Sequence, residues 1–419
     1  MSVAARASIA GIVVAASIVA ARVLAAPAGG APLARMYDDH DWFGLRAAMG
    51  DRESPPLYAG VVASAFNRVD AAERALGRAV REASNGEEAN EARALLAVLY
   101  IRLGRTADAG TVIDDILRAT PERDDIRNLR DIFGAFADRP NQRIVAHSRA
   151  RFSCSVRADG VSLPLTVNDH AVEWLLDTGA NVTVLSRSEA RRLGVTLSGV
   201  GGQAADLAGG SARFQSGTVA HMSIAGTELR NVPVIALPDD QPPWTDLPPA
   251  RQGALGLPVI AALQTIRWTA PGTCEIKSPT LARPVPPNLT LDGLSPLLRV
   301  EIRGRRADFL LDTGNQARTQ LWARFAADFP ELMARGTRGT ARVTQVGGSN
   351  ERAVTVLPEL RIRIGGRLAV IRSANVFAPP VGDRLRAGNI GMEVLSQASS
   401  VTIDFRSMSV ALDETGPTL

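Results

Sequence analysis

The chain has 419 residues, more than the roughly 250–300 residues at which a single hydrophobic core stops growing, so we expect two or more domains. Hydrophobic residues make up 46% of the chain and charged residues 21%, an ordinary balance that excludes a mainly disordered protein. The net charge is only +4 and the basic residues do not form runs, which argues against a nucleic-acid-binding protein.

The first 25 residues have the pattern of an export signal. Arg6 precedes an apolar stretch at 7–21, which is too short for a comfortable membrane span, and small residues allow cleavage after Ala25. Arg22 interrupts the segment, so an uncleaved membrane anchor stays open as an alternative. In both cases we expect the rest of the chain to be exported, either to the periplasm or outside the cell.

Residues 36–148 are predicted to form an all-α domain. Leucines recur at helical spacing at Leu96, Leu99 and Leu103, as on a helix face that packs into a core. The segment 96–121 resembles a tetratricopeptide repeat, and an ordinary helical hairpin bundle is the alternative. Helices of this kind usually bind protein partners or brace a neighbouring domain, so this domain is a candidate site for a protein partner.

From residue 152 the pattern changes to short alternating apolar segments separated by Gly and Pro, which predicts β-structure. This region contains a duplication, because Trp174-Leu175-Leu176-Asp177-Thr178-Gly179 recurs as Phe309-Leu310-Leu311-Asp312-Thr313-Gly314. Two further landmarks repeat downstream of each aspartate: Gly209-Gly210-Ser211 with Gly347-Gly348-Ser349, and Leu255-Gly256 with Ile390-Gly391. The duplication predicts a first lobe at 152–278, a proline-rich linker at 279–296 and a second lobe at 297–413.

The repeated motif has a chemical meaning. A buried strand that ends in Leu-Leu delivers an aspartate to the edge of an apolar core, and a glycine two residues later permits a tight turn. Two similar lobes packed about a twofold axis would bring Asp177 and Asp312 face to face. Two carboxyl groups at about 3 Å share one proton, so one member can accept a proton from water while the other donates to a substrate carbonyl.

The duplicated motif resembles the active site of the aspartic proteases, both pepsin-like and retropepsin-like, over roughly residues 160–412. The resemblance implies a double-lobed, all-β acid-protease barrel fold and an endopeptidase that cleaves peptides or unfolded proteins. Asp177 and Asp312 would be the catalytic dyad. The remaining motif residues would support it: Thr178 and Thr313 would brace the two loops, Gly179 and Gly314 would form the turns, Leu255-Gly256 and Ile390-Gly391 would pack behind them, and the two Gly-Gly-Ser segments would be flaps.

The sequence also departs from the family pattern. Asn315 follows the second motif, where Ala, Ser or Thr is usual, while Ala180 follows the first as expected. A catalytically inactive, peptide-binding relative with a helical docking domain is therefore the alternative to an active protease. A glycosidase also uses paired acids, but its chemistry needs neither Thr-Gly after each acid nor a duplicated lobe.

The two cysteines and four histidines show no CxxC, HExxH or similar ligand spacing, so neither a metal nor a cofactor is expected. Cys154 and Cys274 lie near the two ends of the first lobe. In an exported protein they are able to form a disulfide. Two free buried thiols remain the alternative.

Overall fold

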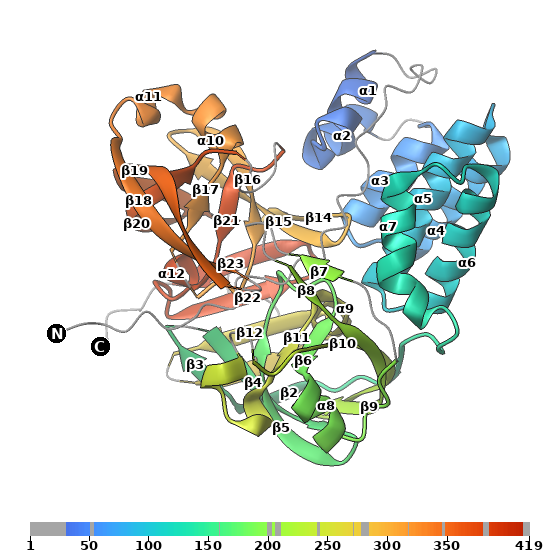
Figure 1. Ribbon diagram of the computed structural model, residues 1–419. Helices are drawn as coiled ribbons and strands as arrows, with labels where there is room; N and C mark the ends of the chain where they lie inside the picture. Colours follow the sequence, from blue (N-terminus) through green and yellow to red (C-terminus); the bar gives the residue numbers. More distant parts are fainter. Residues whose placement is uncertain are drawn as a thin grey trace. The chain divides into compact units, whose positions relative to one another are not determined.

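The computed structural model describes residues 31–50, 54–158, 160–198, 203–205, 211–240, 244–270, 272–277, 285–316, 318–345, 348–379 and 385–413. They form a helical unit, which extends to Asn141 and includes Thr290–Leu294, and a β-rich unit, which comprises Gln142–Leu289 and the chain from Ser295 onward (Figure 1). The predicted fold class, a helical region followed by a double-lobed β fold, is confirmed. The predicted export signal, residues 1–25, lies outside the described residues. Within the described ranges, no helix is long and apolar enough to cross a membrane.

Seven α-helices and one 3-10 turn of the described chain form the helical unit: α1 Ala31–Asp38, α2 Trp42–Met49, α3 Pro56–Ala65, α4 Val69–Glu82, α5 Gly86–Arg102, α6 Thr106–Ala119, α7 Asp124–Phe133 and η1 Gly134–Phe136. From α3 onward each helix packs against the next. Gly60 allows a close approach of α3 and α4, because a Cβ there would lie 2.6 Å from the Leu76 side chain. The segment predicted to resemble a tetratricopeptide repeat is the α5–α6 hairpin, which turns at Gly104 with φ +70°. The repeat assignment itself stays a prediction.

The helical unit differs from the predicted domain in two places: it ends at Asn141, and it includes Thr290–Leu294 from the region between the two lobes. Residues expected to be helical form β1, Arg143–Ala146, because they pair with a strand of the β-rich unit. The predicted linker at 279–296 includes β14, Leu289–Asp292, and Thr290–Leu294 belong to the helical unit. Proline spacing alone could not show this, since the contacts that hold this segment come from distant helices.

A buried arginine binds this segment within the helical unit. Arg102 donates from Nη1 to the Gly293 carbonyl at 3.1 Å and from Nη2 to the Ser64 carbonyl at 2.9 Å. Burial lowers the pKa of Arg102 to about 10, and the nearby Asp292 partly opposes this shift. Asp292 in turn accepts hydrogen bonds from His40 Nδ1 at 2.8 Å and Trp42 Nε1 at 3.3 Å. Residues 290–294 are therefore part of the polar interior of the helical unit.

The two lobes of the β-rich unit share a common order of strands and helices, to which each lobe adds elements of its own. Lobe 1 contains β3 Ser155–Arg157, β4 Gly160–Val167, β5 His170–Leu176, β6 Thr183–Ser186, α8 Arg187–Arg192, β7 Gln203–Ala205, β8 Ser211–Arg213, β9 Gln215–Ile224, β10 Thr227–Leu237, η2 Trp244–Asp246, η3 Pro249–Arg251, β11 Gly253–Leu255 and α9 Leu257–Ala262. Lobe 2 contains β15 Ser295–Ile302, β16 Arg305–Leu311, β17 Gln320–Leu321, α10 Ala323–Asp328, α11 Pro330–Met333, β18 Thr337–Gln345, β19 Gly348–Ile364, β20 Arg367–Phe377, β21 Gly388–Ile390 and α12 Met392–Leu395. The duplicated sequence thus corresponds to a duplicated structure.

The strand pairing is also repeated. In lobe 1, β11 pairs in parallel with β5 and β6 pairs in parallel with β10. In lobe 2, β21 pairs in parallel with β16 and β17 pairs in parallel with β20. Each aspartate-bearing strand, β5 or β16, therefore has a short parallel neighbour that ends beside it.

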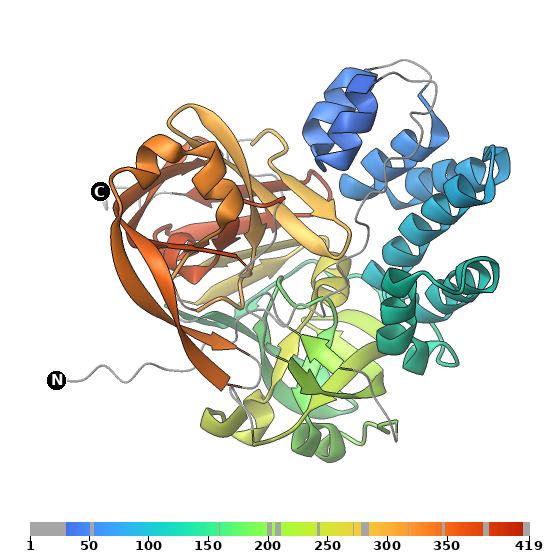
Figure 2. The same ribbon diagram turned by 45° about the horizontal axis from the view of Figure 1, so that its top comes forward.

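A five-stranded sheet joins the two lobes. Its order is β2-β13-β12-β22-β23, formed by Ala150–Ser153, Thr273–Ile276, Thr265–Thr269, Ser400–Asp404 and Ser409–Asp413. The central pairing, between β12 and β22, connects the last strands of lobe 1 to those of lobe 2 (Figures 1 and 2). This shared sheet makes the two lobes one compact unit.

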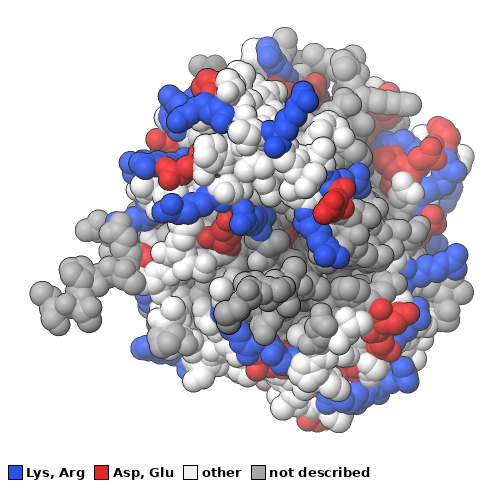
Figure 3. Space-filling view, turned by 60° about the vertical axis from the view of Figure 1, so that its left-hand side comes forward, with Lys and Arg blue, Asp and Glu red and all other residues white. Residues whose placement is uncertain are grey.

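Charged side chains are dispersed over the surface. Figure 3 shows one face, on which arginines lie between acidic and uncharged residues rather than in a single block. Arginines of lobe 2 also form local ion pairs, such as Arg299 with Asp308 at 2.6 Å and Arg361 with Glu359 at 2.7 Å. The arginine-rich composition is thus partly neutralised by local ion pairs.

The structure joins Cys154 and Cys274 in a disulfide. Cys274 lies in β13, and its register partner on β2 is Phe152, so the pairing of the first and last strands of the lobe brings the two sulfurs together. No free cysteine occurs in the protein, because its two cysteines form this bond.

We expect the disulfide to contribute strongly to stability, because it closes a separation of 120 residues. On the chain-entropy model, removing it in a Cys154→Ser/Cys274→Ser double variant lowers the free energy of unfolding by about 4–5 kcal/mol. Denaturant unfolding of the variant and the wild type, with and without reductant, measures this difference. Thiol labelling of the unfolded, non-reduced wild type is the control, and two labelled thiols per chain would show that the bond is absent.

Candidate active site

Each lobe delivers one aspartate at the end of a buried strand. β5 ends at Leu176, and the backbone N–H of Asp177 donates to the Leu255 carbonyl at 3.1 Å. In the same way the N–H of Asp312 donates to the Ile390 carbonyl at 2.9 Å. Leu255 and Ile390 belong to the short parallel strands β11 and β21, which explains why these apolar-Gly landmarks lie directly beside the two aspartate loops.

The two loops are joined by reciprocal hydrogen bonds. Thr178 Oγ1 donates to the Leu311 carbonyl at 2.7 Å, and Thr313 Oγ1 donates to the Leu176 carbonyl at 2.6 Å. Each hydroxyl also accepts from the opposite loop, because the Thr178 N–H donates to Thr313 Oγ1 and the Thr313 N–H donates to Thr178 Oγ1, both at 3.0 Å. Both threonines are fully buried. Four hydrogen bonds thus fix the relative position of the two loops.

The motif glycines make room for the facing carboxyl groups. A Cβ on Gly179 would lie 2.5 Å from Asp312 Oδ1, and a Cβ on Gly314 would lie 2.3 Å from Asp177 Cγ. Behind the loops, a Cβ on Gly256 would lie 2.3 Å from the Val182 carbonyl carbon, and one on Gly391 would lie 2.3 Å from the Asn315 carbonyl oxygen. Any larger side chain at these positions would force the loops apart.

The two carboxyl groups are buried next to each other. Asp177 is 0% exposed and Asp312 is 1% exposed. Burial, and after it the negative charge of Asp312, hold the pKa of Asp177 well above its usual range, while the backbone N–H groups of Gly179 and Ala180 oppose this shift. A hydrogen bond between the two carboxyl groups contributes in the same upward direction. The pair therefore has the physical requirements for holding one proton between two acids.

The hydrogen bonds to the two carboxylates are not equivalent. Asp312 Oδ1 accepts from the N–H groups of Gly314 and Asn315 at 3.1 and 3.0 Å, and Asp312 Oδ2 accepts from Asn389 Nδ2 at 2.9 Å. Asp177 Oδ1 accepts from the Gly179 N–H at 2.9 Å. Asp177 Oδ2 is buried, and none of the described protein groups donates to it.

Asn389 was not among the site residues predicted from the sequence. The sequence does contain a signal for it. When the two apolar-Gly landmarks are extended and aligned, Gly253-Ala254-Leu255-Gly256 lies opposite Gly388-Asn389-Ile390-Gly391. Asn389 is the one polar side chain in these two otherwise apolar segments. Asn315, the departure from the family pattern, is accommodated as a buried loop residue, and its carbonyl accepts the Met392 N–H at 3.0 Å. The same bond occurs in lobe 1 between Ala180 and Leu257, at 2.8 Å.

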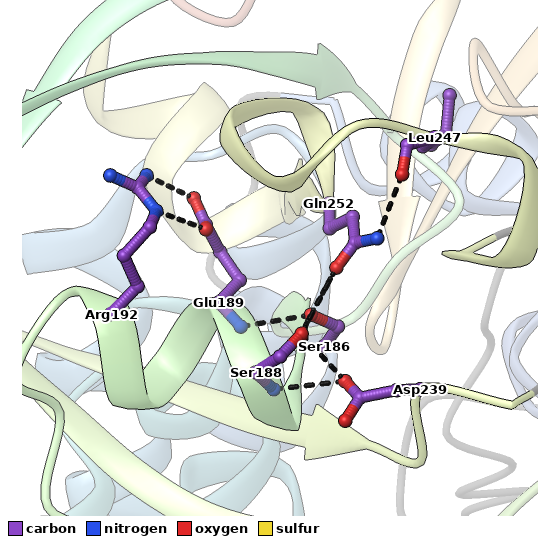
Figure 4. A network of polar contacts seen from close by, with 7 residues as sticks. All are labelled: Ser186, Ser188, Glu189, Arg192, Asp239, Leu247 and Gln252. Atoms are coloured by element: carbon purple, nitrogen blue, oxygen red, sulfur yellow. Dashed lines mark hydrogen bonds and ion pairs between the residues drawn. The ribbon is translucent and has the colours of Figure 1, made fainter.

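A polar network joins β6, which follows the first aspartate loop, to the start of β11 (Figure 4). Gln252, which directly precedes β11, accepts from Ser186 Oγ at 2.7 Å through its side chain, and its carbonyl accepts the Ser186 N–H at 3.0 Å. Its amide also donates to the Leu247 carbonyl at 2.8 Å. Ser188, the second residue of α8, donates from its N–H to Asp239 Oδ1 at 2.9 Å. The network thus connects the end of β6 to the start of β11, the antiparallel strand with which β6 pairs.

The predicted flaps correspond to two β-hairpins. β7 pairs with β8 in lobe 1, and β18 pairs with β19 in lobe 2. Ser211 begins β8, and Gly348 and Ser349 begin β19, whereas Gly209, Gly210 and Gly347 lie outside the described residues. The flap role of both segments stays a prediction. Among the described side chains, no group of three or more His, Cys, Asp or Glu is placed to hold a metal ion.

Comparison with known proteins supports the resemblance seen in the sequence. Residues 163–259 match the family model described as aspartyl protease, a segment that includes Asp177 and Leu255-Gly256. The resemblance to the aspartic proteases is thereby confirmed for lobe 1, and lobe 2 repeats its elements. No curated protein matches the chain significantly.

Solved structures of low identity also match the chain. A retropepsin-like aspartic protease from Rickettsia conorii shares 14% identity, with 31% of this chain and 93% of the other covered and a TM-score of 0.23. Aspartic proteinase from Irpex lacteus shares 12% identity, with 64% and 98% covered and a TM-score of 0.40. Basic 7S globulin from soybean shares 11% identity, with 65% and 98% covered and a TM-score of 0.39. At these scores the likenesses add nothing to the geometry described above.

The threonine bonds can be tested by stability measurements. Thr178→Val removes one donor and one acceptor and leaves the Thr313 N–H and the Leu311 carbonyl unpaired, so we expect the free energy of unfolding to fall by about 2–4 kcal/mol. Thr402→Val is the matched control, because Thr402 is also a buried threonine but its Oγ1 has no hydrogen-bond partner within the described structure. That substitution should be neutral or stabilising. Equal losses for both variants would mean that the reciprocal bonds do not brace the lobes.

The raised pKa of Asp177 predicts a specific pH dependence of stability. At a pH below the unfolded value of about 3.9 both states are protonated, whereas at higher pH the unfolded state ionises first, so stability is lost as pH rises toward and through the folded pKa. Asp177→Asn removes this loss and should be increasingly more stable than wild type above about pH 4. Urea unfolding from pH 3.5 to pH 8 measures the difference. The surface variant Asp328→Asn is the control, and a difference for Asp177→Asn that does not change with pH would contradict the assignment.

Proposed function

We propose that the protein is an aspartic-type endopeptidase that hydrolyses peptide bonds through a water molecule activated by Asp177 and Asp312. The observation that carries the proposal is the facing pair of buried carboxyl groups, which two repeated loops hold together through the bonds of Thr178 and Thr313. A purely structural aspartate pair would be expected to ion-pair with a cation or to be replaced by neutral residues, because burying two acids is costly.

The proposed reaction uses one proton on the pair. The ionised carboxylate takes a proton from water as the water oxygen forms a bond to the carbonyl carbon of the peptide. The protonated carboxyl gives its proton to the carbonyl oxygen, which produces a neutral tetrahedral diol. Transfer of a proton to the amide nitrogen and cleavage of the C–N bond then release an amine and a carboxylic acid.

The surroundings of the pair favour this chemistry. Burial of the pair strengthens electrostatic interactions there, and the fixed loops need no rearrangement as charge moves. The hairpins β7–β8 and β18–β19 are the elements that we propose close over a bound peptide. The proposal places the protein in an oxidising compartment outside the cytoplasm, because disulfides such as Cys154–Cys274 persist there.

The dyad should behave as one unit. Asp177→Asn and Asp312→Asn should each lower kcat by about 10³-fold or more, and the double variant should be hardly worse than either single variant, because each loss removes both the shared proton and the activating charge. Wild-type kcat/KM should follow a bell-shaped pH profile. Cleavage of a denatured-protein mixture and of peptides derived from it measures these effects.

The surface variant Asp328→Asn is the control and should retain full activity. Residual activity in Asp312→Asn beside an inactive Asp177→Asn would mean that lobe 2 is only a structural partner. A folded wild type that binds peptides but cleaves none at any pH would instead identify a peptide-binding relative without catalysis.

A further inference from the structure

The two lobes differ at one position next to the dyad. Ala254 in β11 and Asn389 in β21 occupy equivalent places, since Ala254 is the register partner of Leu175 and Asn389 is the register partner of Leu310. Leu175 and Leu310 are themselves equivalent residues of the duplicated motif. A methyl group in lobe 1 therefore corresponds to a hydrogen-bonding amide in lobe 2.

The amide of Asn389 is directed to the dyad. Its Nδ2 donates to Asp312 Oδ2 at 2.9 Å, and the residue is only 7% exposed. Its Oδ1 is buried and accepts no hydrogen bond from the described residues, so within this part of the chain the carboxylate is the partner that orients the amide. A buried polar side chain that makes a single hydrogen bond contributes little to the stability of the fold. Its position is better explained by its effect on Asp312.

The hydrogen bonds distribute the charge of the pair unequally. With the Gly314 and Asn315 N–H groups, Asn389 completes a set of three donors on Asp312. Donors stabilise the ionised form of an acid, and a bond to a charged acceptor is about twice as strong as one between neutral groups. Asp177 has no counterpart of the Asn389 amide, because Ala254 occupies the equivalent position in lobe 1.

The charged groups around Asp312 do not reverse the preference of the negative charge for Asp312 over Asp177. The group that faces it across the twofold is Asp177. On the elements packed against its loop, β16 carries Asp308, which is ion-paired with Arg299, together with Arg305 and Arg306 at its exposed start. α12 carries Glu393, which accepts the Thr319 N–H at 2.6 Å, and β21 carries no charged residue.

We propose that Asn389 is a positioning residue that holds the negative charge of the pair on Asp312 and thereby leaves the shared proton on Asp177. For its effect on catalysis the inference rests on the proposed function, whereas the placement of the proton can be measured without any activity. In the reaction, Asp312 then accepts the proton of the water and Asp177 donates to the peptide carbonyl.

Removal of the Asn389 amide should shift the acid limb of the pH profile and leave the basic limb in place. The acid limb reports the step from the doubly protonated to the singly ionised pair, and the basic limb reports loss of the second proton. Asn389 stabilises ionised Asp312, so its removal should raise the pKa of the first step. The second step should be nearly unchanged, because Asp312 is ionised both before and after it.

The test compares Asn389→Ala and Asn389→Leu with wild type. The first substitution introduces the residue that lobe 1 already has at this position, and the second keeps the branched shape without a donor. In both variants the acid limb of kcat/KM should move up by about one pH unit, with about tenfold lower kcat/KM on the acid side and an unmoved basic limb. Gln320→Leu is the matched control, because Gln320 is the register neighbour of Asn389 on β17 and no described hydrogen bond joins its side chain to either aspartate.

A second readout is independent of activity. The ¹³C NMR signals of labelled aspartate carboxyl groups, assigned with Asp177→Asn and Asp312→Asn, follow each acid directly. Asp312 should titrate first in wild type, and this step should move up in both Asn389 variants and stay in place in Gln320→Leu. If wild type cleaves no peptide but the titration behaves in this way, the proposed function fails and the inference stands. A folded Asn389 variant with an unmoved first step, or a wild type in which Asp177 ionises first, would overturn the inference.

Discussion

The reciprocal bonds between Thr178 and Thr313 determine how the two aspartate loops face each other. Each hydroxyl donates to a carbonyl at the end of the opposite aspartate strand and accepts an N–H of the opposite loop. Because one symmetric arrangement forms four buried hydrogen bonds, a shift of either loop would break several of them at once. The facing position of the two aspartates follows from this constraint.

That position has an energetic cost, which the surrounding structure offsets. Two adjacent carboxyl groups without exposure to water destabilise the fold once both are ionised, and the raised pKa of Asp177 expresses this cost. Backbone N–H groups, tight packing behind Gly256 and Gly391, the shared five-stranded sheet and the disulfide all act in the opposite direction. A site of this kind is expected where chemistry, rather than stability, determines the residues.

Duplication supplies a symmetric site, yet proton transfer needs two acids in different states. In a dimer of identical chains the two acids have equivalent surroundings, so neither is built to hold the proton. In a single chain the two lobes can differ permanently, and the exchange of Ala254 for Asn389 is such a difference at hydrogen-bond distance from the dyad. Other features of the loops, such as the carbonyl bonds of Ala180 and Asn315, are repeated in both lobes.

The fold class, the two lobes and the identity of the facing aspartates could be predicted from local sequence. A repeated apolar-apolar-Asp-Thr-Gly motif with matching glycines downstream is a pattern with few structural solutions. Local sequence could not determine the boundary near residue 141 or the membership of residues 290–294 in the helical unit, since both depend on pairing with distant residues such as Leu229 and Arg102. Cys154 and Cys274 were recognisable as candidates, but only the pairing of β2 with β13 brings them into bonding distance. Asn389 was visible as a polar residue in an apolar repeat, and its contact with Asp312 was not. Hydrogen bonds between residues far apart in the chain are formed by the packing of strands, and no local pattern contains that information.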